Sequence, residues 1–99
     1  MAKGYWIAHI TIHAPERYPD YIAAARPAFE EYGAKFLVRG GAHDCVEGNS
    51  GERHVVIEFP SMETALACYH SEQYQKAAAI RAEASTGTLT IVEGVEGVD

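Results

Sequence analysis

Three side chains of different chemistry stand at matching positions of three predicted strands: His9, Arg39 and Glu58. Side chains alternate between the two faces of a strand, so residues of the same parity share a face. An imidazole with a pKa of about 6.5 beside a carboxylate can act as a general base, and a guanidinium can hold an anionic or enolate oxygen. The pattern predicts a catalytic group of His9, Arg39 and Glu58 if their strands are neighbours.

The same charges also have a structural interpretation. Arg39 and Glu58 could form a buried ion pair that fixes a subunit interface, because charges removed from water need a partner. Two functions therefore stay open. One is a small-molecule enzyme that carries out proton transfer or oxygenation on a small polar or aromatic substrate. The other is a non-catalytic structural or ligand-binding dimer.

We expect no metal and no cofactor. His9 and His13 lie four residues apart on one strand, a separation of about 13 Å, whereas Zn–N bonds are about 2.1 Å. This spacing argues against a site built from these two residues, although one that combines His9 with residues of other strands stays open. Cys45 and Cys68 have neither metal-binding nor redox spacing and are expected to be small, half-buried apolar residues in a reducing cytosol.

The elements that position these residues follow from local patterns. Runs rich in β-branched and aromatic residues predict strands at 5–12, 35–39, 54–59 and 88–93. Apolar residues at three-to-four spacing predict a helix from Pro15, restarting at Pro19 and ending at Gly33. Ser61 and Ser71 are expected to cap two further helices, at about 62–69 and 72–83.

Two interruptions are also expected. Pro27 predicts a kink or a restart in the first helix, because it lacks an amide proton. Gly40-Gly41 should break or bulge the second strand, which is expected to resume at about 44–47 before a turn at 48–51.

The element order β-α-β-β-α-β predicts one ferredoxin-like α+β domain spanning residues 1–99, with a four-stranded antiparallel sheet and helices on one face. One face is uniformly apolar and is expected to lie under the helices: Ala8, Ile10, Ile12, Phe36, Val38, Val55, Ile57, Phe59, Leu89 and Ile91. The opposite face mixes polar residues with Ile7, Leu37, Val56 and Val92. Since a bare apolar patch is seldom tolerated, this face predicts a homodimer that forms an α+β barrel.

Net charge and hydropathy exclude some classes of binding partner. The net charge is −6 and the isoelectric point is near 5.3, which argues against nucleic acid and anionic membranes, because both attract basic surfaces. No apolar run is long enough for a membrane span, and the first residues lack a signal pattern. We therefore expect a cytoplasmic protein with a possible small-molecule ligand.

The chain also resembles a known family. Its hallmarks are GYW at Gly4–Trp6, FLVRGG at Phe36–Gly41, VVIEFPS at Val55–Ser61 and ALACYHSEQYQ at Ala65–Gln75, followed by Arg81. These motifs resemble the domain of unknown function 1330 family, within the dimeric α+β barrel superfamily. The resemblance implies a ferredoxin-like fold, a homodimer and no established activity. Related barrels include cofactor-independent quinol monooxygenases, haem-degrading enzymes and muconolactone isomerases, so fold alone does not select a reaction.

Overall fold

The computed structural model describes residues 2–96 of the chain. The strands are β1 (Gly4–Ile12), β2 (Lys35–Arg39), β3 (Arg53–Phe59) and β4 (Ser85–Glu93). The helices are α1 (Tyr18–Glu31), α2 (Met62–His70) and α3 (Glu72–Ala84). None of the helices in these residues is long and apolar enough to cross a membrane.

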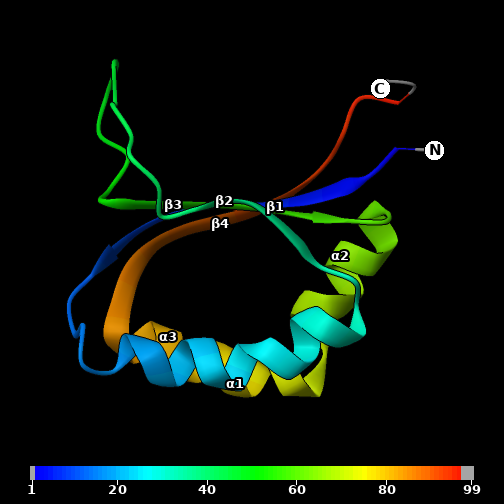
Figure 1. Cartoon of the computed structure of the whole chain (residues 1–99), viewed down its shortest axis with the longest axis horizontal. Helices are drawn as coiled ribbons and strands as arrows, with labels where there is room; N and C mark the ends of the chain where they lie inside the picture. The colour runs from blue at the N-terminus through cyan, green and yellow to red at the C-terminus, as the bar shows by residue number, and fades with distance from the viewer. Residues whose placement is uncertain (1, 97–99) are drawn as a thin grey trace.

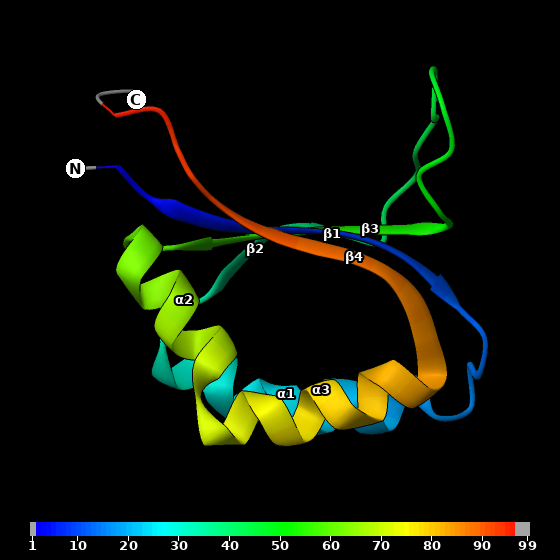
Figure 2. The same ribbon diagram turned by 180° about the vertical axis from the view of Figure 1, so that it is seen from behind.

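The strands form one antiparallel sheet in the order β2-β3-β1-β4, and all three helices lie on the same side of it. Figure 1 and the reverse view in Figure 2 show α1 and α3 running along the sheet while α2 closes one end of the molecule. The predicted ferredoxin-like α+β fold is confirmed. The sheet face opposite the helices is called the open face below.

The predicted serine caps are confirmed at both later helices. The Ser61 hydroxyl accepts a hydrogen bond from the Thr64 backbone N–H at 3.1 Å, and the Ser71 hydroxyl accepts one from the Tyr74 N–H at 3.2 Å. Each bond satisfies a backbone donor that a helix start leaves unpaired. Ser71 therefore marks the boundary between α2 and α3, and its cap fixes the backbone of Tyr74 in the first turn of α3.

Helix α1 continues through Pro27, so the expected restart is not found. Proline removes one hydrogen bond from the helix, but tertiary packing can hold the backbone in place. Ala25 and Ala28 on either side of Pro27 are fully buried in the core. Their packing accounts for the unbroken helix.

The segment after β2 differs from the prediction. No strand resumes at 44–47; residues 40–52 form a loop that rises away from the helices (Figure 1). Nearly all of this loop is exposed, and Val46 is 83% exposed. The segment has no apolar face to bury, so pairing with the sheet would bring it no hydrophobic stabilisation.

Strand β2 contains a one-residue bulge that changes the faces of its last residues. Phe36 pairs with Ile57, but the next pairs are Val38 with Val56 and Arg39 with Val55, so Leu37 is the extra residue. Beyond a bulge of this kind the alternation of side chains is reversed. Val38, predicted to lie under the helices, is therefore on the open face and is 41% exposed.

Trp6 is the centre of the core between sheet and helices. Its ring lies 4.8 Å from that of Tyr74, 5.3 Å from Phe59 and 5.4 Å from Phe29, measured between centroids. Its indole N–H donates to the Ala65 carbonyl at 2.9 Å, which links β1 to α2. Buried aromatic clusters of this kind carry much of a small domain's stability.

Close packing of β1 against α2 generates a stability prediction. A Cβ atom added at Gly4 would lie 2.5 Å from the Ser61 carbonyl oxygen and 2.7 Å from the Met62 Cα. Gly4→Ala should therefore lower the free energy of unfolding by about 2–3 kcal/mol, as overpacking does. Gly41→Ala, where the added Cβ meets nothing within 4 Å, is the matched control. Urea denaturation checks both; equal midpoints in the two variants would contradict this packing.

Candidate functional site

A cavity of about 260 Å³ lies between the sheet and the two long helices. Aromatic and aliphatic side chains make up most of its wall, among them Trp6, Phe29, Phe36, Ile57 and Leu89. Pockets for drug-sized ligands measure about 300–1,000 Å³, so this one suits a smaller molecule. Its wall is apolar except for a group of charged and phenolic side chains.

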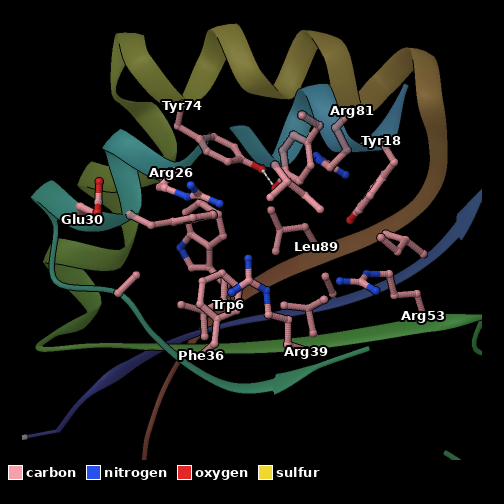
Figure 3. Close-up of a pocket in the computed structure, with 18 residues that line it drawn as sticks. Trp6, Tyr18, Arg26, Glu30, Phe36, Arg39, Arg53, Tyr74, Arg81 and Leu89 are labelled. Atoms are coloured by element: carbon pink, nitrogen blue, oxygen red, sulfur yellow. Dashed lines mark hydrogen bonds between the residues drawn. The ribbon is translucent and has the colours of Figure 1, made fainter. Parts of the chain in front are cut away.

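Four arginines line the cavity, one from each of four elements: Arg26 on α1, Arg39 on β2, Arg53 on β3 and Arg81 on α3. Figure 3 shows Arg39 and Arg53 on the strand side and Arg26 and Arg81 on the helix side, with all four side chains directed toward the space between. We call them the cavity arginines. The one acidic residue in the wall is Glu30.

No carboxylate neutralises the cavity arginines within the described residues. The ion pairs of residues 2–96 join Lys3 to Glu58 and Arg17 to both Asp20 and Glu83. Guanidinium groups stay charged at any physiological pH. The cavity wall is therefore strongly electropositive although the whole chain carries a net charge of −6.

The strand-side arginines are close neighbours because of the bulge. Arg39 pairs with Val55 and Arg53 pairs with Ile10, which places both on the helix side of adjacent strands. Diagonal positions of this kind lie about 7–8 Å apart. The Arg39 guanidinium lies 4.1 Å from the centre of the Phe36 ring, and this cation–π contact orients it against the cavity wall.

Two of the cavity arginines have buried donors without partners. The Nε atoms of Arg53 and Arg81 are shielded from solvent, and neither has a hydrogen-bond partner among residues 2–96. An unpaired buried donor is costly, and more so on a charged group. An anion in the cavity would supply the missing acceptors.

A pair of tyrosines joins the arginines on the helix side. The Tyr21 and Tyr74 hydroxyl oxygens are 3.0 Å apart, joining α1 to α3. Burial raises the pKa of Tyr21, and the neighbouring Tyr74 adds to the effect. Burial also raises the pKa of Tyr74, while hydrogen bonding to Tyr21 and the charge of Arg81 oppose it. Both phenols remain protonated at neutral pH.

The predicted group of His9, Arg39 and Glu58 is not assembled. Arg39 lies on the cavity side, whereas Glu58 is on the open face, where it accepts from the Lys3 ammonium at 3.4 Å and the Tyr5 hydroxyl at 3.3 Å. The predicted Arg39–Glu58 ion pair is absent from the described residues for two reasons: the bulge moves Arg39 to the other face, and Glu58 pairs with Lys35, four residues before Arg39 in β2. A catalytic role for His9 or Glu58 stays a prediction.

His9 instead belongs to a histidine cluster on the open face. Its Nδ1 lies 2.8 Å from the Nδ1 of His54, and the His43 ring stacks against His54 with centroids 4.4 Å apart. Partial burial and the imidazoles of His43 and His9 lower the pKa of His54. Within residues 2–96 no three His, Cys, Asp or Glu side chains are arranged to hold a metal ion.

The cysteines are divided between surface and core. Cys68 is fully buried, and burial raises the pKa of its thiol to about 12, so it behaves as the expected apolar residue. Cys45 lies exposed in the loop after β2, which differs from the expected half-buried position.

Sequence reasoning missed Arg26, Arg53 and the role of Arg81. A signal was available for Arg53, because it shares parity with Val55, Ile57 and Phe59 on the face expected to be apolar. Arg81 follows Tyr74 by seven residues, which is two turns of one helix face. A charge on an apolar face is unusual enough to mark a site.

Fold and site together define a ferredoxin-like α+β protein with an arginine-lined cavity between its sheet and its helices. The chain belongs to the family described as domain of unknown function DUF1330, whose model matches residues 3–95. None of the curated proteins matches the sequence significantly.

Solved structures are similar in fold. A protein of unknown function from Rhodopseudomonas palustris has a TM-score of 0.70 at 16% identity, covering 99% of this chain and 84% of that chain. A cofactor-independent oxygenase from Streptomyces nogalater has a TM-score of 0.64 at 11% identity, covering 99% and 98%. A dimeric ferredoxin-like protein of unknown function from Thermobifida fusca has a TM-score of 0.61 at 18% identity, covering 95% and 92%.

The histidine cluster generates a pH prediction. Because the folded state lowers the pKa of His54, the unfolded chain binds more protons once the pH falls below about 6.5. The free energy of unfolding should therefore decrease from about pH 6.5 downward and be insensitive to His54 above it. His54→Gln should reduce the difference in urea midpoint between about pH 7.5 and about pH 5.5.

His70→Gln removes an exposed imidazole from the end of α2 and is the control for this experiment. It should not reduce the pH dependence. If the difference in urea midpoint is the same in His54→Gln as in the wild-type protein, the imidazole cluster does not lower the pKa of His54.

Proposed function

We propose that the protein binds a small organic anion in the cavity between sheet and helices. One observation carries the proposal: four guanidinium groups line a partly open, mostly apolar pocket, and no carboxylate of residues 2–96 pairs with them. Like charges held together cost free energy unless a counter-charge is present. An anionic ligand supplies that charge.

The wall also limits the body of the ligand. Trp6, Phe29 and Phe36 present ring faces and edges to the cavity, and aliphatic side chains complete the wall. Such a surface favours an aromatic or compact aliphatic body, with the anionic group directed to the arginines. Guanidinium groups hold carboxylates through paired hydrogen bonds, and Arg39 and Arg53 both face the cavity from adjacent strands. A single-ring aromatic acid fits the volume of about 260 Å³.

The fold is compatible with small-molecule chemistry. The structural neighbour from Streptomyces nogalater is a cofactor-independent oxygenase of the same fold. At 11% identity it supports the fold alone, so the ligand proposed for this chain rests on the cavity arginines.

Isothermal titration calorimetry with benzoate tests the proposal. The wild-type protein should bind benzoate and should bind its neutral analogue benzamide at least about tenfold more weakly, since only benzoate offers a charge. Arg39→Gln should weaken benzoate binding by about tenfold or more.

Arg17→Gln removes an equal charge from an arginine that pairs with Asp20 and Glu83 outside the cavity, and it should leave benzoate binding unchanged. Equal losses in the Arg39 and Arg17 variants would point to net charge and not to the cavity. No binding of benzoate to the wild-type protein would contradict the proposal for aromatic carboxylates.

We further propose that two copies associate through their open faces. This face exposes Leu37, Val38 and Val92 by 47%, 41% and 40%. Val56 and Ile7 lie between the edge strands β2 and β4 on the same face, and an exposed apolar face is seldom left in water by a monomer. The similar protein from Thermobifida fusca is described as dimeric, which supports a dimer of this chain. The loop 40–52 projects on this side of the sheet and would border the partner (Figure 1).

Sedimentation velocity tests the dimer. Val92→Lys places a charge within the proposed interface and should convert the dimer to a monomer at micromolar concentration, because a charge buried without a partner is costly. Leu66→Lys introduces the same charge on α2, on the helix side of the sheet, where the residue is 37% exposed, and should leave the assembly intact. A monomeric wild-type protein, or a Val92→Lys variant that sediments as the wild type does, would contradict an open-face dimer.

A further inference from the structure

The Tyr21–Tyr74 pair is part of the cavity wall and is not explained by anion binding to the arginines. Both residues line the cavity, and Figure 3 shows the Tyr74 hydroxyl directed into it, joined by the dashed hydrogen bond. Tyr74 is fully buried, and its hydroxyl is the polar end of a side chain that otherwise packs on Trp6. Buried hydroxyls ordinarily satisfy both their donor and their acceptor capacity.

One of the two hydroxyl protons of the Tyr21–Tyr74 pair has no acceptor among the described residues. Each phenol has one hydroxyl proton and accepts through its oxygen. The two oxygens are 3.0 Å apart, so one proton lies in the hydrogen bond between them. The further hydrogen-bonding neighbour of Tyr74 is Arg81, which can only donate, so within residues 2–96 the second proton has no acceptor. Burial favours the neutral form of both groups, so this proton is not lost to solvent at neutral pH.

The free donor has a cationic neighbour. Arg81 lies on the same face of α3 as Tyr74, two turns further along, and its buried Nε also lacks a partner. A phenol proton and a guanidinium N–H thus converge on the helix side of the cavity. Arg39 and Arg53 are on the opposite, strand side. The cavity offers hydrogen-bond donors on two opposed walls.

We propose that the ligand has two oxygen-bearing ends: an anionic group held by Arg39 and Arg53, and a second oxygen that accepts hydrogen bonds from the Tyr21–Tyr74 pair and Arg81. The ligand class is then an oxygenated organic acid, such as a keto- or acyl-substituted aromatic acid, and not a simple hydrocarbon acid. This inference rests on the anion-binding function proposed above. It adds a requirement for a carbonyl, enolate or similar acceptor at the far end.

Matched ligand pairs test this requirement. The probes are 4-acetylbenzoate and 4-isopropylbenzoate, together with the corresponding 3-substituted pair; the two members of each pair have similar shape, and only the acetyl group is an acceptor. Calorimetry with the wild-type protein should show the acetyl compound binding about fivefold or more tightly than the isopropyl compound in at least one pair.

Variants identify the donor. The double variant Tyr21→Phe, Tyr74→Phe should lose this preference while binding 4-isopropylbenzoate within about twofold of the wild type. Removing both hydroxyls together leaves neither one unpaired, so the variant is expected to fold. Tyr32→Phe, which changes a tyrosine outside the cavity wall, should keep the wild-type preference.

The possible results distinguish failure of the tyrosine assignment from failure of the proposed anion binding. A preference that persists in the double variant, or that is absent from both pairs in the wild type, overturns the assignment of the tyrosines while leaving anion binding intact. Failure of the wild type to bind either member of either pair overturns the proposed function itself. If the double variant does not fold, each single Tyr→Phe variant is measured, and unchanged preference in both overturns the assignment.

Discussion

The arrangement of charges depends on one extra residue in β2. Without the bulge at Leu37, the register set by the Phe36–Ile57 pair would place Arg39 opposite His54 on the open face. With the bulge, Arg39 lies on the cavity side at a position diagonal to Arg53, and the backbones of such positions are about 7–8 Å apart. Arg26 and Arg81 add two further cations to the same cavity, so its wall carries four like charges. Such a wall favours an anionic ligand, which is the function proposed above.

The same bulge separates the two faces of the sheet into different roles. The helix side holds an aromatic core around Trp6 and, next to it, the arginine-lined cavity. The open face keeps His9 and Glu58 with their own partners, His54 and Lys3, together with exposed valines. The residues predicted to form one group are therefore divided between the arginine-lined cavity and the open face.

Much of the fold could be predicted from local residues. Ser61 and Ser71 mark helix starts by a mechanism that needs no tertiary information, and alternation in β1, β3 and β4 correctly separates the buried face from the open one. The bulge could not be predicted, because it is a property of hydrogen-bond register between β2 and β3, and Lys35–Arg39 has no glycine or proline to mark it. The glycines predict an interruption at Gly40-Gly41, whereas the bulge lies earlier in the strand, at Leu37. Continuity through Pro27 likewise depends on the packing of Ala25 and Ala28 and not on local propensity.

Only some of the cavity arginines could be predicted from the sequence. The chemistry of Arg39 predicts a site residue, but the partners that parity predicts for it, His9 and Glu58, lie on the opposite face of the sheet. Arg53 could have been found as the one charge on an otherwise apolar strand face, whereas Arg26 on an exposed helix turn carries no comparable signal.

A crystal structure of the protein soaked with 4-bromobenzoate would test the central claim most directly, because bromine is located by its anomalous scattering. The account predicts a bromine peak between the sheet and the helices, with the carboxylate in contact with Arg39 or Arg53. A cavity that contains only water while the bromine lies on the open face, or no bound bromine at a saturating concentration, would contradict it.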